Sequence, residues 1–156
     1  TLRDEYLVLF PGEASKSLAD NSFMLEEFLA AEHDADQLKL NLQALPTKQA
    51  LLHGHCHQKA FAALSPVQKI LGLIPGLEVK AIDSSCCGMA GSFGYEKEHY
   101  ETSMAMGSLS LFPSIEASQD NVLIVADGTS CRGQIEHGTG RQALHVARVL
   151  QMALPS

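Results

Sequence analysis

From residue 49 onward, short apolar runs alternate with segments in which apolar residues recur at helical spacing. We interpret three of the runs as strands, at 49–54, 77–82 and 121–126. The last run, NVLIVA, is unbroken and β-branched, which is typical of a parallel strand covered on both faces. Helices are expected at 58–64, at 66–74, at 96–112 up to Pro113, and in the last segment, where Thr139 is a candidate N-cap between two glycines. This order of elements predicts an α/β fold with a three-layer, Rossmann-like parallel sheet flanked by helices.

The N-terminal part of the chain has helical spacing and no run of strand character. A short helix is expected at 2–10 and a longer one at 17–32. We therefore divide the chain into a helical lead-in at 1–48, which we take as the end of a preceding half-domain, and a cysteine-rich domain at 49–156. A start at Thr1 without a methionine or a signal peptide suggests a piece of a longer protein.

Composition narrows the class of protein. Apolar residues make up 46% and charged residues 19% of the 156 residues, which excludes an intrinsically disordered chain. The formal net charge of −7 argues against a nucleic-acid partner or a general affinity for anionic membranes. The apolar runs fall well short of the roughly 18 residues that a transmembrane helix needs. A globular domain without a membrane-spanning segment is expected.

Cysteines follow all three predicted strands. Cys56 comes after the first strand, Cys86 and Cys87 after the second, and Cys131 after the third. In an open parallel sheet the βα loops emerge at the carboxyl edge of the strands, so we expect the four thiols to converge there. Thiolates hold iron–sulfur clusters and zinc, and the helix starts expected near Cys56 and Cys131 favour the thiolate form. The alternative is that the cysteines are buried as ordinary small apolar side chains.

Two further features bear on this site. His55 and His57 flank Cys56 and are candidate extra ligands or hydrogen-bond donors to sulfur, although either could instead satisfy local backbone groups. The loop 88–94 has the spacing G-x-x-G-x-x-G, which offers an alternative nucleotide- or anion-binding site but matches neither the dinucleotide nor the Walker pattern. Its glycines could equally let backbone N–H groups approach sulfur closely.

Three segments carry a resemblance to a known family: HGHCHQKA at 53–60, SSCCGMAGSFGYE at 84–96 and ADGTSCRGQIEHGTGR at 126–141. Together they resemble the cysteine-rich CCG domain of heterodisulfide reductase B subunits and glycolate oxidase iron–sulfur subunits, over about residues 50–150. They look especially like the C-terminal part of fused FAD-linked oxidases. The chain departs from the family pattern in having one CCG motif, and in having Gly128 where the family often has the first cysteine of a C-x-x-C pair.

The resemblance implies an iron–sulfur electron-transfer domain or subunit of a flavin-dependent 2-hydroxyacid oxidoreductase of the glycolate or D-lactate type. Cys56, Cys86, Cys87 and Cys131 would hold the cofactor, with His55 and His57 as candidate extra ligands. Four cysteines suffice for a 4Fe–4S cluster but fall short of the five-cysteine form, so a cubane and a non-cubane cluster both stay open.

Cofactors and partners outside the chain follow from the same resemblance. FAD would be bound elsewhere in the parent protein, and the partners would be flavin and ferredoxin-like domains or subunits, so the isolated chain is expected to have no turnover. We expect a cytoplasmic location, and peripheral association of the parent with the inner face of a membrane stays open. A structural zinc site that organises a protein-interaction domain is the second hypothesis, and nucleotide or anion binding at 88–94 is the third.

Overall fold

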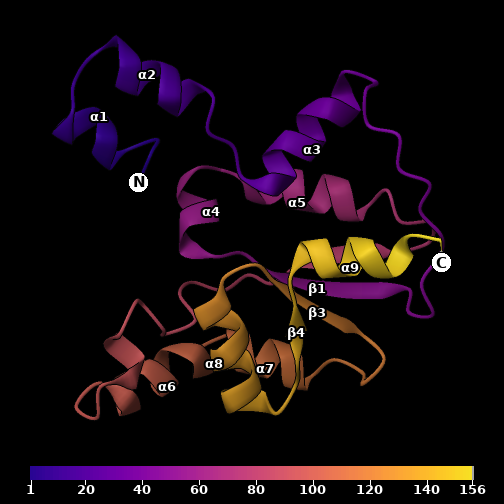
Figure 1. Cartoon of the computed structure of the whole chain (residues 1–156). Helices are drawn as coiled ribbons and strands as arrows, with labels where there is room; N and C mark the ends of the chain where they lie inside the picture. Colours follow the sequence, from indigo (N-terminus) through magenta and orange to yellow (C-terminus); the bar gives the residue numbers. More distant parts are fainter. Residues whose placement is uncertain (156) are drawn as a thin grey trace.

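The computed structural model describes residues 1–155 as helices flanking a parallel β-sheet (Figure 1). In that part of the chain the sheet has four strands, β1 (Gln49–His53), β2 (Glu78–Ala81), β3 (Leu123–Ala126) and β4 (Ala143–Leu144). The strand order is β2-β1-β3-β4, and all three neighbouring pairs are parallel. The prediction of an α/β fold with a parallel sheet flanked by helices is therefore confirmed.

The helices fall into groups on the two sides of the sheet. They are α1 (Glu5–Leu9), α2 (Glu13–Asp20), α3 (Leu25–Asp34), α4 (Cys56–Ala60), α5 (Leu64–Leu71), the 3-10 turn η1 (Phe93–Tyr95), α6 (Tyr100–Ser108), α7 (Leu111–Glu116), α8 (Thr129–Thr139) and α9 (Val146–Ala153). In Figure 1, α3, α5 and α9 lie on one side of the sheet, whereas α6, α7 and α8 lie on the other. None of the helices described in 1–155 is both long and apolar enough to cross a membrane.

The side chains of β3 show how the sheet separates two hydrophobic cores. Leu123 and Val125 pack with α3, α5 and α9, while Ile124 and Ala126 pack with α7 and α8. Successive side chains of a strand point to opposite faces, so an unbroken apolar strand must be covered on both. This explains why the run at 121–126 is apolar at every position of the strand.

Two predicted helices are each divided in the structure. The helix expected at 17–32 is α2 followed by α3, with the break at 21–24. The helix expected at 96–112 is α6 followed by α7, and Pro113 lies in the first turn of α7 instead of stopping a helix. Proline is tolerated in a first turn because the backbone N–H groups there have no intrahelical partner.

The last segment also differs from the prediction. Thr139 is the final residue of α8, where its hydroxyl donates to the carbonyl of Ile135 at 2.7 Å, so it is not an N-cap. Gly140, with φ of 70°, ends the helix, and the two-residue strand β4 follows. His145 is the N-cap of α9, and its Nδ1 accepts from the backbone N–H of Ala147 at 3.1 Å.

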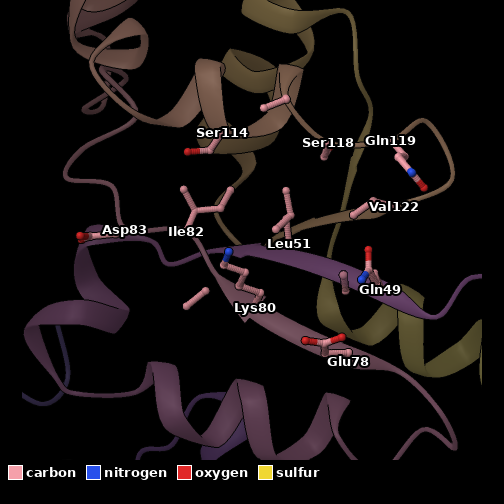
Figure 2. A pocket seen from close by; sticks show the side chains of 13 residues that line it. Gln49, Leu51, Glu78, Lys80, Ile82, Asp83, Ser114, Ser118, Gln119 and Val122 are labelled. Carbon is pink, nitrogen blue, oxygen red and sulfur yellow. The ribbon is translucent and has the colours of Figure 1, made fainter.

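The largest hollow in the molecule lies along β1 and β2, on the side that faces α7 (Figure 2). This cavity of about 820 Å³ runs from Gln49 and Glu78, the first residues of the two strands, past Lys80 to Asp83. Its described lining residues include no cysteine and no histidine. The cysteines therefore do not line this cavity.

Helices α6 and α8 come together around one aromatic ring. A Cβ atom built at Gly107 of α6 would lie 2.3 Å from Cζ of Phe112, and one built at Gly138 of α8 would lie 2.4 Å from the same atom. Both distances are far shorter than a van der Waals contact, so the Phe112 ring can occupy this place only because both glycines lack a side chain. The ring sits in the core that α7 and α8 form with the sheet.

We therefore expect Gly138→Ala to destabilise the protein by about 1–3 kcal/mol, because the added methyl group overpacks the Phe112 site. Gly133→Ala is the matched control in the same helix, since its Cβ would meet nothing within 4 Å. That control should be neutral or stabilising by up to about 1 kcal/mol, because alanine has the higher helix propensity. Chemical denaturation followed by circular dichroism measures both values. Equal stability of the two variants would contradict this account.

Candidate metal centre

The structure distributes the four cysteines over three elements around the carboxyl edge of the sheet. Cys56 is the first residue of α4, Cys86 and Cys87 lie between β2 and η1, and Cys131 is in the first turn of α8. All four are free thiols. Cys56 is exposed and Cys86 is partly buried, whereas Cys87 and Cys131 are buried. The set therefore consists of a buried inner pair and a more accessible outer pair.

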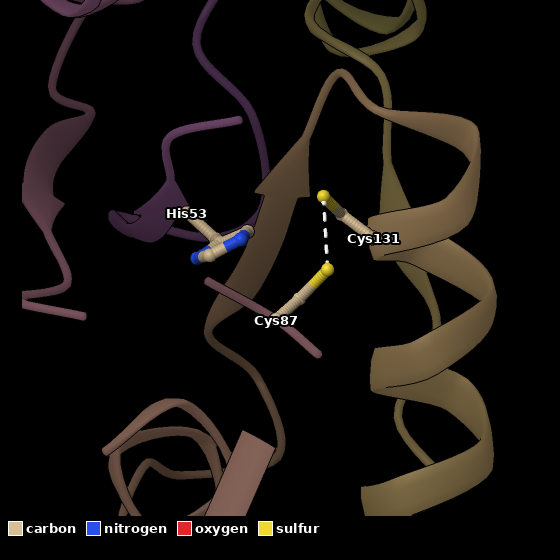
Figure 3. A group of neighbouring side chains, drawn as sticks. All are labelled: His53, Cys87 and Cys131. Atoms are coloured by element: carbon tan, nitrogen blue, oxygen red, sulfur yellow. Dashed lines mark hydrogen bonds between the residues drawn. The ribbon is translucent and has the colours of Figure 1, made fainter. Parts of the chain in front are cut away.

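The inner pair forms a compact cluster with one histidine (Figure 3). The sulfur atoms of Cys87 and Cys131 are hydrogen-bonded at 3.4 Å. His53, the last residue of β1, lies beside them, and the three candidate ligand atoms are all within 4.8 Å of one another. All three side chains are buried. Two sulfur atoms and one imidazole nitrogen at such distances form a donor set that zinc or an iron–sulfur centre accepts.

His53 shows an unmet bonding capacity at this cluster. Its Nδ1 lies 2.9 Å from the hydroxyl oxygen of Ser84, which orients the ring. Its Nε2 is buried and has no hydrogen-bond partner among the described residues. A buried polar atom without a partner is costly, so native structures rarely keep one without a functional reason. A metal-bound group at this edge would fit the unpartnered nitrogen.

The electrostatics of the inner pair are asymmetric. The hydrogen bond with Cys131 lowers the pKa of Cys87, against the opposing effect of burial, and His53 adds to the lowering. The same hydrogen bond, together with burial, raises the pKa of Cys131. The pair therefore favours one thiolate and one thiol. A cation would take the place of the remaining proton, because metal binding requires deprotonated sulfur.

The outer pair lies close enough to interact with the inner one. Burial raises the pKa of Cys86, the backbone N–H of Gly88 opposes this by donating to its sulfur at 3.3 Å, and the thiol of Cys56 raises it further. The charges of Cys56 and Cys86 also raise the pKa of Cys131. The four sulfur atoms thus share one electrostatic environment, although no described hydrogen bond joins the inner pair to the outer one.

Gly128 makes room for the cluster. A Cβ atom at this position would lie 2.5 Å from Cδ2 of His55 and 2.9 Å from the sulfur of Cys131. Any side chain here would push the imidazole or the sulfur away. The ring of His55 therefore occupies the space into which a residue with a side chain, such as a cysteine at 128, would have to fit.

The two histidines next to Cys56 have different surroundings. His55 is the N-cap of α4, and its Nδ1 accepts from the backbone N–H of His57 at 3.2 Å. Burial lowers the pKa of His55, which favours the neutral imidazole. His57 is exposed and stacks on Phe61, with its Nε2 3.9 Å from a carboxylate oxygen of Asp4. Of the two, His55 is the one that lies against Cys131 and Gly128.

The glycine-rich loop 88–94 is arranged around sulfur and a buried serine. The N–H of Gly88 is used by the sulfur of Cys86. A Cβ atom at Gly94 would lie 2.5 Å from both the sulfur of Met89 and the hydroxyl of Ser103, so that end of the loop is closely packed. Gly91, with φ of 57°, faces open space. The loop brings backbone close to sulfur, as glycine allows.

Several residues of the site escape sequence reasoning. His53 ends an apolar strand, and only the register of the sheet shows that it faces the inner pair. Lys59 donates from Nζ to the carbonyl oxygens of Ser84 and Ser85, at 2.9 Å in the second case, and so holds the segment before Cys86. A usable signal for His53 was its position, because the carboxyl end of a strand is where ligands of parallel sheets gather.

Together, the fold and the site define a cysteine-rich α/β domain with a candidate metal centre at the carboxyl edge of its sheet. The chain is 37% identical over 153 residues to one subunit, the C protein, of the anaerobic glycerol-3-phosphate dehydrogenase of Escherichia coli K12, a match that covers 98% of this chain and 37% of that protein. It is 29% identical over 149 residues to the D-2-hydroxyglutarate dehydrogenase of Pantoea ananatis, covering 95% of this chain and 14% of that protein.

The D-2-hydroxyglutarate dehydrogenase of E. coli K12 is similar as well, with 25% identity over 149 residues and the same shares of the two chains. No family model matches the chain. No solved structure matches it either. The chain is thus a cysteine-rich domain homologous to segments of dehydrogenases and of a dehydrogenase subunit, and it spans well under half the length of these relatives.

A pair of carboxyl groups lies beside the metal centre. Glu26 of α3 is only 4% exposed, and burial, followed by the neighbouring charge of Asp127, raises its pKa. Asp127 accepts from Nε2 of Gln58 at 2.5 Å and from the backbone N–H of Val146 at 2.9 Å. His145 Nδ1 is 3.7 Å from the same carboxyl. With this set of donors, Asp127 is the better placed of the two to carry the negative charge, and Glu26 to keep the proton.

This arrangement predicts a pH dependence of stability. Because the pKa of Glu26 is raised in the folded state, the folded chain binds more protons than the unfolded chain above the usual glutamate range. The contribution of Glu26 is therefore fully present at low pH and is lost as the pH rises through its folded-state pKa. Glu26→Gln should make the free energy of unfolding less dependent on pH between about 4 and 8. Denaturant titrations across that range measure the slope.

Glu13→Gln, at an exposed position of α2, is the control and should leave the slope unchanged. A wild-type stability that rises through the same range, with no change of slope in the Glu26 variant, would show that Glu26 is ionised in the folded chain.

Proposed function

We propose that this chain is an iron–sulfur electron-transfer domain of a flavin-dependent dehydrogenase that oxidises an alcohol group of a small anionic substrate. The observation that carries the proposal is the buried cluster of His53, Cys87 and Cys131, with one unpartnered imidazole nitrogen and two sulfur atoms 3.4 Å apart. A buried group of this kind has no evident role as packing alone, because apolar side chains would fill the space without unmet hydrogen bonds.

The proposed ligands are Cys56, Cys86, Cys87 and Cys131. Their shared electrostatic environment supports this set, since the charges of the other three thiols all raise the pKa of Cys131. Four thiolates are the usual ligands of a 4Fe–4S cluster, which, when bound, supplies a one-electron relay. In this role the chain excludes water from the inner pair and directs the N–H of Gly88 at Cys86.

The substrate class is proposed from what the relatives have in common. Their names refer to glycerol 3-phosphate and to D-2-hydroxyglutarate, and each of these compounds carries a hydroxyl group next to an anionic group. Glycolate and D-lactate, the substrates suggested by the resemblance to CCG domains, share that chemistry. We propose a parent enzyme of this class, and we propose that the domain itself is of the CCG type with a Rossmann-like arrangement of three layers.

The flavin site and the substrate site are proposed to lie outside this chain, because the chain spans 37% of the dehydrogenase subunit and 14% of the hydroxyglutarate enzymes. The partners would be flavin and ferredoxin-like domains or subunits of the same oxidoreductase. We place that assembly in the cytoplasm, with contact to a membrane made through the partner subunits.

The test is the iron and acid-labile sulfide content of protein reconstituted without oxygen, together with its electron paramagnetic resonance spectrum after reduction. We expect both elements and a cluster signal in the wild type, and loss of most of the iron in Cys87→Ser and Cys131→Ser. Ser85→Ala, at an exposed position next to the cysteine pair, is the control and should keep its iron. A wild-type chain that takes up neither iron nor sulfide would refute the proposal.

A structural zinc site is the second candidate, and the position of His53 favours it. Zinc accepts one imidazole and two or three thiolates in a closed tetrahedral site. His53→Ala separates the two candidates. Removal of a zinc ligand should abolish stoichiometric zinc binding, whereas a cluster held by four thiolates should still form in that variant. Stoichiometric zinc without iron in the wild type would decide for the second candidate.

A further inference from the structure

Two buried polar side chains stand behind the cysteine pair and take no part in the proposed ligand set. Ser103 of α6 and Gln134 of α8 are each only 1% exposed. Nε2 of Gln134 donates to the carbonyl oxygen of Ser103 at 3.2 Å and to its hydroxyl oxygen at 3.0 Å. The Ser103 hydroxyl in turn donates to the carbonyl oxygen of Gly88 at 2.7 Å. Burying an amide and a hydroxyl is costly unless they are hydrogen-bonded, so the network holds these groups in one geometry.

Gly88 is the residue on which this network acts. Its φ of +93° is a conformation that residues with side chains rarely adopt. A Cβ atom at Gly88 would lie 2.1 Å from the carbonyl oxygen of Ser103 and 3.1 Å from Nε2 of Gln134. The backbone of the loop therefore packs directly on the Ser103–Gln134 pair, which only glycine permits at this point.

The other side of Gly88 faces sulfur. Its backbone N–H donates to Sγ of Cys86 at 3.3 Å and opposes the effect of burial on that thiol. Residue 88 is thus held at both ends, by Ser103 at its carbonyl oxygen and by Cys86 at its N–H. Hydrogen bonds to ligand sulfur favour the thiolate and are among the features that set the potential of iron–sulfur sites.

We propose that Ser103 and Gln134 are positioning residues of the metal centre, which act through Gly88 to direct its N–H at the sulfur of Cys86. The pair thereby strengthens metal binding by the cysteines and makes the bound centre easier to reduce. This inference rests on the proposed function for its redox part, and on the four cysteines alone for its binding part.

Cobalt(II) titration of the metal-free chain tests the binding part, because cobalt thiolates have a visible absorption that reports the bound metal. Ser103→Ala removes the donor to Gly88 and should weaken cobalt binding roughly tenfold, the lower end of the range for residues that orient ligands. Ser108→Ala is the matched control. It lies in the same helix and bonds only to the carbonyl of Met104, so its affinity should equal that of the wild type.

Gln134→Met keeps the length of the side chain but not its N–H donors, and should weaken cobalt binding in the same direction as Ser103→Ala. The two changes should be less than additive in the double variant, because both act through one hydrogen-bonded unit. Circular dichroism checks that each variant is folded. If Ser103→Ala does not fold, Gln134→Met carries the same test alone. Unchanged cobalt affinity in folded Ser103→Ala or folded Gln134→Met would overturn the proposal.

The reduction potential of the reconstituted centre is a readout that general loosening of the fold would not shift in one direction. We expect a more negative midpoint potential in Ser103→Ala than in Ser108→Ala, because an N–H donor to sulfur is displaced. If the wild type forms no cluster, the proposed function fails while the cobalt titration still decides the role of Ser103. If the wild type forms a cluster and Ser103→Ala has the same potential, the positioning role fails alone.

Discussion

Parallel pairing of β1 with β2 and with β3 is the constraint on which the cysteine site depends. The register places His53 opposite Ala126, and Leu52 opposite Ala81, so all three strands end at one edge of the sheet. The segments that follow them carry the cysteines, and they emerge side by side for that reason alone. Had one of these strands run the other way, its cysteine would lie at the opposite edge, about four or five residues of extended chain away.

The second requirement is close approach, and glycine provides it at several points around the site. Gly128 lets the ring of His55 and the sulfur of Cys131 lie against the same backbone, and Gly88 lets a loop rest on Ser103. Side chains at these positions would separate the groups by more than the length of a hydrogen bond to sulfur. The consequence is a loop with positive φ at Gly88 and Gly91, which is held in place by Lys59 on one side and by buried polar groups on the other.

Sequence patterns were a good guide where the signal is local. The strands expected at 49–54, 77–82 and 121–126 match β1, β2 and β3 to within two residues, because runs of apolar and β-branched residues reflect burial on both faces. Helix boundaries were harder to predict. The break between α6 and α7 and the placement of Pro113 depend on how Phe112 packs against two glycines, which no periodicity records. The strand β4 has only two residues, too few to produce a pattern.

For the site, the sequence by itself determined that a cysteine follows each of three strands, and hence that thiols would gather at one edge of a parallel sheet. Only the tertiary structure decided that Cys87 and Cys131 form the buried pair, that His53 joins them, and that Ser103 and Gln134 stand behind the loop. The reason is physical. Residue type and spacing along the chain report local burial, whereas contacts between distant side chains depend on strand register and on how closely helices pack, and these are settled only when the whole core forms.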